Sequence, residues 1–77
     1  MRIRTRLAVW TGHFVDGEKL MAAMEKKGFT VSTLAFRVRM SEQMLQEIID
    51  GQRAISFLDM TRLAGLLGVG STELMKQ

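Results

Sequence analysis

Three arginines stand close together at the start of the sequence. Arg2, Arg4 and Arg6 have no acid among them, and the remaining eight of the 11 Lys and Arg residues are balanced by 8 Asp and Glu. The net charge of +3 therefore belongs to this short segment. Guanidinium groups on such an arm can follow a phosphate backbone or enter an A·T-rich minor groove. The alternative is a basic strand face that keeps a dimer in solution.

Other kinds of site chemistry find little support in the residue types. The chain has no cysteine and one histidine, which excludes thiolate metal sites, disulfides and a His-rich metal centre. His13 and Asp16 are neighbours in sequence, but no nucleophile or oxyanion site accompanies them. No Gly-rich phosphate loop is present. We therefore expect no enzyme, no cofactor and no metal.

Length and hydropathy set the class of protein. The 77 residues amount to one small domain, and a hydrophobic content of 47% is too high for a disordered chain. No apolar run approaches the roughly 18 residues of a membrane span, and no long apolar stretch follows the charged start. A cytoplasmic protein with no membrane partner is expected. Because a domain this small is only marginally stable, a partner or a dimer would help it.

Glycines and capping residues divide the chain into short helices. The expected helices span about 18–27, 31–38, 42–49 and 57–67, followed by a short turn that contains Leu74. Their expected N-caps are Asp16, Thr30, Ser41 and Ser56, the last in a capping-box-like pair with Asp59.

Helical spacing then predicts the residues that face inward. They are Leu20, Met21, Met24, Leu34, Ala35, Val38, Leu45, Ile48, Ile49, Phe57, Met60, Leu63, Ala64 and Leu67. Gly65 lies within the fourth helix and is either simply tolerated or a point where another backbone approaches closely.

The first ten residues are ambiguous. Ile3, Leu7 and Val9 alternate with more polar neighbours, which fits either a short strand paired with a second chain or a disordered arm. We accordingly divide the chain into a basic arm or strand at 1–15 and a helical domain at 16–77.

Two of the expected helices, 31–38 and 42–49, are separated by only three residues, which is typical of a helix-turn-helix. Residues 28–35, 40–51 and 62–69 resemble, in order, the second, third and fourth helices of Cro and phage-repressor-like (Cro/C1-type, XRE-like) domains. The resemblance implies an all-α, five-helix lambda-repressor-like domain that binds double-stranded DNA. Residues 48–56 are also similar to HigA-type antitoxins, which implies a toxin as a second partner.

The resemblance also implies which residues touch DNA. The third helix would enter the major groove, where Glu42, Gln43, Gln46 and Glu47 would read base edges. Glutamine can bind adenine in a bidentate way, and glutamate can accept from cytosine. The N-cap Ser41 and the loop residue Arg53 would meet phosphates.

These assignments have alternatives in which the residue does not contact DNA. Gln43, Gln46 and Arg53 could be ordinary solvated residues. Met44 could touch a thymine methyl group or pack at the edge of the core.

Two positions depart from the family pattern. The second helix often begins with a phosphate-binding Gln, and Val31 stands there instead. The junction between the two helices often contains Gly, and Arg39 stands there instead. Arg39 must therefore adopt a positive φ, which is costly for a residue other than glycine, or extend the preceding helix.

Several apolar residues fall off the inward faces. Phe36, Leu58 and Leu66 suggest association, and Trp10 and Phe14 could cover the domain or form a dimer seam. We therefore expect a transcriptional repressor that binds a palindromic operator as a homodimer. The alternatives are a HigA-like antitoxin that binds a toxin and represses its own gene, or a protein-interaction adaptor with a degenerate helix-turn-helix.

Overall fold

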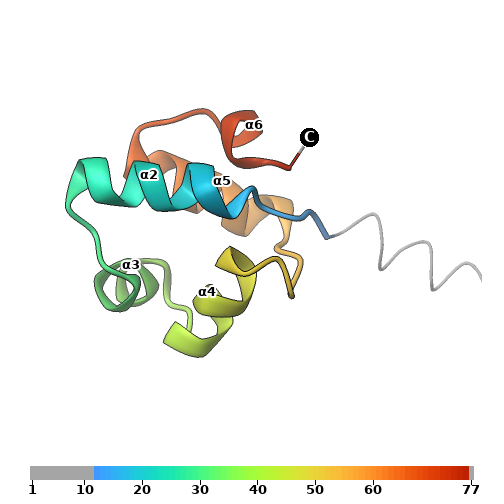
Figure 1. Cartoon of the computed structure of the whole chain (residues 1–77), viewed down its shortest axis with the longest axis horizontal. Helices are drawn as coiled ribbons and strands as arrows, with labels where there is room; N and C mark the ends of the chain where they lie inside the picture. Colours follow the sequence, from blue (N-terminus) through green and yellow to red (C-terminus); the bar gives the residue numbers. More distant parts are fainter. Residues whose placement is uncertain (1–11, 77) are drawn as a thin grey trace, which may run out of the picture.

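The computed structural model describes residues 12–76, which form five helices joined by short loops (Figure 1). The helices are α2 (Gly17–Lys27), α3 (Val31–Val38), α4 (Glu42–Ile49), α5 (Phe57–Leu67) and α6 (Ser71–Leu74). In Figure 1, α2, α5 and α6 lie together on one side of the core, and α3 and α4 lie on the other. The all-α, five-helix prediction is confirmed, and so are the expected helix boundaries to within one residue.

Local hydrogen bonds explain where the helices begin. Asp16 accepts from the backbone N–H groups of Glu18 and Lys19, and Ser56 accepts from that of Asp59. The capping-box-like pair expected at Ser56 and Asp59 provides the bond to the Ser56 side chain, and Thr30 and Thr33 form a reciprocal box in which each side chain accepts from the other's backbone N–H. All these caps satisfy N–H groups that have no partner inside the helix.

The segment before α2 is extended and belongs to the packed domain. His13 exchanges two backbone hydrogen bonds of 2.8 Å with Ile55, in the loop before α5. The N–H of Asp16 donates to Leu74 O, and that of Lys76 donates to Phe14 O. Val15 lies between these contacts and is only 2% exposed. The arginines Arg2, Arg4 and Arg6, Trp10 and the expected strand lie outside the described residues.

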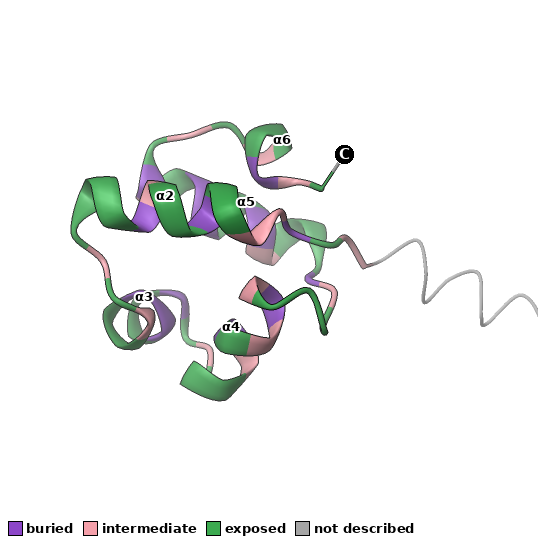
Figure 2. Cartoon of the chain, in the orientation of Figure 1, coloured by how far each residue is buried: buried purple, intermediate pink, exposed green. Residues whose placement is uncertain are grey.

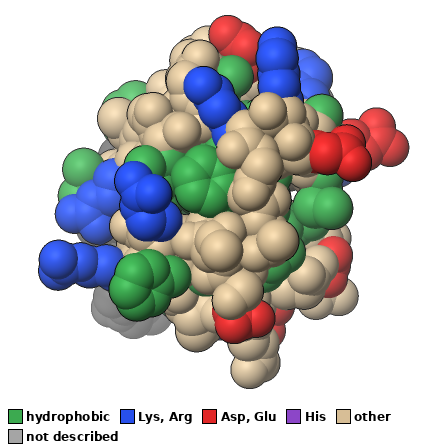
Figure 3. All heavy atoms as spheres, turned by 90° about the vertical axis from the view of Figure 1, so that its left-hand side faces the viewer, with side chains coloured by type: hydrophobic (Ala, Val, Ile, Leu, Met, Phe, Trp, Pro, Cys, Tyr) green, Lys and Arg blue, Asp and Glu red, His purple; other side chains and the backbone are tan. Residues whose placement is uncertain are grey.

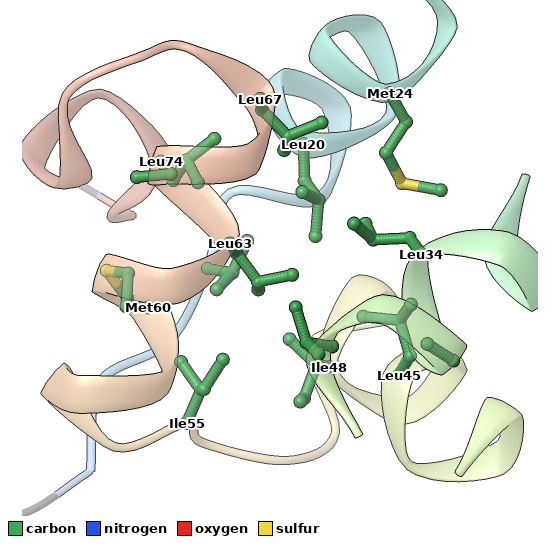
Figure 4. Packing of buried hydrophobic residues seen from close by; sticks show 14 residues of the cluster. Leu20, Met24, Leu34, Leu45, Ile48, Ile55, Met60, Leu63, Leu67 and Leu74 are labelled. Atoms are coloured by element: carbon green, nitrogen blue, oxygen red, sulfur yellow. The ribbon is translucent and has the colours of Figure 1, made fainter. Parts of the chain in front are cut away.

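One apolar core joins all five helices. The largest buried side chains point into a common interior from every helix (Figure 4). Residues of this core include Leu20, Met24, Leu34, Leu45, Ile48, Ile55, Met60, Leu63, Leu67 and Leu74. Within residues 12–76 no polar or charged side chain is buried. Figure 2 shows the buried residues on the helix sides that face one another.

Two of the expected core residues are exposed. Met21 is 47% exposed because the core-facing line of α2 runs through Leu20 and Met24, and Met21 lies off that line. Phe57 is 55% exposed because it is the first residue of α5, beyond the end of the core, where its ring meets His13 edge-on. Helical spacing alone does not show where the core stops.

Gly17 and Gly65 differ in how closely other atoms approach them. A Cβ added at Gly17 would collide with the carbonyl oxygen of Ile49, so α2 starts directly against the end of α4. A Cβ at Gly65 would have no neighbour within 4 Å. Of the two alternatives for Gly65, the structure supports a simply tolerated glycine, and the close approach occurs at Gly17.

Candidate nucleic-acid interface

The turn between α3 and α4 is built around a residue with positive φ. Arg39 has φ 60° and ψ 48°, the left-handed conformation that glycine adopts most easily. Its N–H donates to Phe36 O, and the N–H of Met40 donates to Ala35 O at 2.9 Å. The structure therefore selects the first of the two conformations considered for Arg39. The arginine keeps the tight turn although it lacks the freedom of glycine.

The turn leads directly into α4, one side of which is held by the core. Leu45 and Ile48 are buried, and Ile49 packs against the core from its edge. Met44 also packs there, so the structure supports its role as a peripheral core residue. Ser41 caps the helix by accepting from the backbone N–H of Met44 at 3.0 Å. The opposite side of α4 is left open to solvent.

That open side carries the candidate base-reading residues. Glu42, Gln43 and Gln46 are exposed, and Glu47 is half-buried at the edge of the same face. These four residues and Ser41 are thus brought together on one helix and its cap. Arg53, from the loop six residues after Glu47, joins them through a side-chain contact. The structure places every described candidate on one continuous surface.

Side-chain hydrogen bonds link these residues to one another. Arg53 Nε donates to Glu47 Oε1 at 2.8 Å, and Gln43 Nε2 donates to Glu47 Oε2 at 3.4 Å. Gln46 Nε2 donates to Asp50 Oδ1 at 3.0 Å. Asp50 was not among the expected site residues, although the spacing of four between Gln46 and Asp50 is a known signal for such a pair on a helix.

The charge on this surface is acidic. α4 and its C-cap carry three acids, Glu42, Glu47 and Asp50. Among residues 12–76, Arg53 is the one cation that forms an ion pair with any of them. The hydrogen bond from Arg53, and after it the one from Gln43, lowers the pKa of Glu47 below its ordinary value. Glu47 therefore carries its charge across the whole neutral range.

Positive charge gathers on a different part of the domain. Figure 3 views the domain from the side of α3 and shows Lys and Arg side chains clustered on its left, beside exposed hydrophobic groups. Arg37, Arg39 and Arg62 line a hollow between α3 and α5. Arg37 also lies over the ring of Phe29, with 6.0 Å to the ring centroid. Within the described residues, attraction to phosphate is thus weak on α4 itself.

Two other kinds of site are absent from the described residues, a metal centre and a membrane-spanning helix. No group of three or more His, Cys, Asp or Glu residues there is placed to hold a metal ion. None of the helices that the structure describes is long and apolar enough to cross a bilayer.

α3 and α4 adjoin each other across a tight turn, and α4 exposes a polar face. This arrangement is a helix-turn-helix motif. The helix-turn-helix family model (HTH_3) matches residues 20–74, and the chain belongs to this family of DNA-binding, non-enzymatic regulators. Among curated protein sequences none matches the chain.

A solved structure gives a more particular likeness. The chain resembles the restriction-modification controller protein C.AhdI from Aeromonas hydrophila, with a TM-score of 0.67 and 28% sequence identity. The match covers 74% of this chain and 86% of that chain. The Cro/C1-type helix-turn-helix prediction is therefore confirmed.

Proposed function

We propose that this protein is a sequence-specific transcriptional repressor that binds a palindromic DNA operator as a homodimer. The observation that carries the proposal is the exposed polar face of α4, which follows a tight turn and is fixed by a buried opposite face. In helix-turn-helix proteins the second helix of the motif lies in the major groove and its first turns meet the bases. Such a protein works where the DNA lies, so the proposal includes a cytoplasmic location.

Gln43 and Gln46 are the principal base readers in this proposal. Each amide can offer a donor and an acceptor to adenine N7 and N6, a pairing worth about 1–3 kcal/mol of discrimination. In the free protein these amides donate to Glu47 and Asp50. Those bonds are exposed, and i,i+4 pairs of this kind contribute only about 0.2–0.5 kcal/mol. Breaking these bonds so that the amides can bind DNA bases therefore costs little free energy. Glu42, at the first position of α4, would accept from a cytosine amino group.

Phosphate contacts come from two other places in the proposal. The N-terminus of α4, capped by Ser41, presents backbone N–H groups to a phosphate. Arg2, Arg4 and Arg6 supply the positive charge that α4 lacks, along the backbone or in the minor groove. Deleting residues 1–6 should weaken DNA binding and reduce its salt dependence while the far-ultraviolet circular dichroism stays unchanged. An unchanged salt slope would show that the arm does not touch phosphate.

Association into a dimer is supported by exposed apolar side chains. Phe36 is 80% exposed and Leu58 62% exposed, and a second copy of the chain that covered them would remove their apolar surface from water. Leu66, also considered for this role, packs against the core instead. In a homodimer the two α4 helices would meet half-sites about 34 Å apart, one helical turn of DNA. Sedimentation at several protein concentrations measures the dimer directly.

A toxin-binding antitoxin that represses its own gene is the second candidate. The same exposed Phe36 and Leu58 support it, because a toxin could cover them as well as a second copy could. A third candidate is an adaptor that no longer binds DNA, which the acidic face of α4 favours. Two observations together would favour the antitoxin: an adjacent gene that encodes a small basic toxin, and binding of that toxin to the purified protein.

Selection from a random pool of duplex DNA with the purified protein tests the proposed function. The expected result is an enriched palindromic sequence with two half-sites about one helical turn apart. A dimer that contacts about 6–10 phosphates should lose about 10³–10⁵-fold in affinity between 50 and 200 mM salt. Binding that shows no sequence preference, or no salt dependence, would contradict the proposal.

A further inference from the structure

Glu47 links the recognition helix to the loop that follows it. Its two carboxylate oxygens take different partners: Oε1 accepts from Arg53 Nε at 2.8 Å and Oε2 accepts from Gln43 Nε2 at 3.4 Å. The Glu47 side chain is 29% exposed and the Arg53 side chain 48% exposed. When Gln43 turns to a base, as proposed above, the shorter bond of Glu47 to Arg53 remains. Glu47 is thus suited to hold Arg53 in place.

The bond to Glu47 determines where the Arg53 guanidinium lies. Arg53 comes from the loop between α4 and α5, yet its Nε bonds a side chain of α4. One carboxylate therefore separates the guanidinium from Gln43, a candidate base reader. The described residues offer no hydrogen-bond partner to its two terminal nitrogens. Arg53 thus places a guanidinium with two unbonded terminal nitrogens beside Glu47, at the edge of the exposed face of α4.

The ion pair favours a base over a phosphate as the target of these donors. The charge of Arg53 is balanced by Glu47 at 2.8 Å, so a phosphate would be attracted by the guanidinium and repelled by the carboxylate. Guanine carries no charge and presents two acceptors, O6 and N7, in the major groove. The paired donors of an arginine match this edge, and the bond from Nε to Glu47 leaves both terminal nitrogens of Arg53 for the base.

We propose that Arg53, positioned by Glu47, reads a guanine in the major groove, so that the specificity surface includes the loop as well as α4. This inference rests on the proposed function. It changes the role that family resemblance implies for both residues: Arg53 reads a base, and Glu47 is a positioning residue. Each operator half-site should then contain one G·C pair that depends on both side chains.

The test compares DNA selections and salt titrations for the wild type, Arg53→Gln and Glu47→Gln. Arg53→Gln should reduce the preference for guanine at one position of each half-site by roughly 5- to 150-fold and leave the other positions unchanged. Glu47→Gln should weaken the same preference. It should also increase the salt slope by about one per subunit, because the unpaired guanidinium becomes available to phosphate.

Two control variants match these changes elsewhere on the domain. Glu25→Gln removes an acid from an exposed position on α2, and Arg37→Gln removes an arginine from α3. Neither should change the preference at any base pair. Circular dichroism of each variant confirms that it is folded.

The outcomes separate this inference from the proposed function. If the wild type selects a sequence but Arg53→Gln keeps the same preferences and only loses about one unit of salt slope, Arg53 contacts phosphate and the inference is wrong. If Glu47→Gln changes nothing at the position that depends on Arg53, the positioning role is wrong. If the wild type selects no sequence, the proposed function fails and this inference fails with it.

Discussion

Gly17→Ala should destabilise the domain although alanine is the better helix former. The added Cβ would overlap the carbonyl oxygen of Ile49, a backbone atom that cannot rotate away. Relief requires α2 and α4 to move apart, and overpacking of this kind costs about 1–3 kcal/mol. For a domain of this size each kcal/mol lowers the melting temperature by about 4–8 °C. Because α4 would shift, DNA binding should weaken as well.

Gly65→Ala is the matched control, since it makes the same chemical change within a helix of the same domain. Nothing lies within 4 Å of the added Cβ, and Gly65 is exposed in the interior of α5. Alanine should therefore stabilise the domain by about 1 kcal/mol through helix propensity. Thermal and urea unfolding followed by circular dichroism measure both variants. Equal shifts of the same sign would refute the close packing of α2 against α4.

Three further predictions concern the turn and α4. Arg39→Gly should raise the free energy of unfolding by about 0.5–1 kcal/mol, because relief of roughly 1–2 kcal/mol of left-handed strain exceeds the extra conformational entropy that glycine loses on folding. Arg39→Ala, which keeps a Cβ, should not raise the free energy of unfolding. A rise equal to that of Arg39→Gly would refute the strain. Ser41→Ala and Ser56→Ala should each destabilise the domain by about 1 kcal/mol, since each removes an N-cap, but only Ser41→Ala should weaken DNA binding at a temperature where both are folded. Since the pKa of Glu47 is lowered in the folded protein, its contribution to stability is complete above the ordinary glutamate pKa of about 4.3 and is lost as the pH falls through the folded value. Arg53→Gln should therefore flatten the pH dependence of unfolding below about pH 4.5, and an unchanged profile would speak against the ion pair.

The helices were predictable because their signals are local. Asp16, Thr30, Ser41 and Ser56 each precede a helix and accept from its first free N–H groups, and such capping depends on residues two or three apart. The exposed face of α4 followed in the same way, because Leu45 and Ile48 fix which side is buried.

Features that depend on tertiary packing could not be predicted from the sequence. Met21 and Phe57 both satisfy helical spacing. For Met21, the neighbouring helices decide which side of α2 faces the core. For Phe57, they decide where along α5 the core ends. The contact of Gly17 with Ile49 joins residues 32 positions apart, and nothing in the local sequence signals it.

The candidate site shows the same division. Spacing along α4 indicates that Gln43 and Glu47 can meet, since they are four residues apart on one helix. The bond from Arg53 to Glu47 depends instead on the path of the loop after α4, which helical periodicity does not specify.

Equilibrium titration of a selected operator and of an unrelated duplex, at the same stated salt concentration, tests the central claim most directly. If α4 reads DNA through Gln43 and Gln46, the operator should bind at least about 10³-fold more tightly than the unrelated duplex. Gln43→Ala combined with Gln46→Ala should remove most of that ratio while the protein stays folded. A ratio near one for the wild type, or an unchanged ratio for the double variant, would contradict the claim.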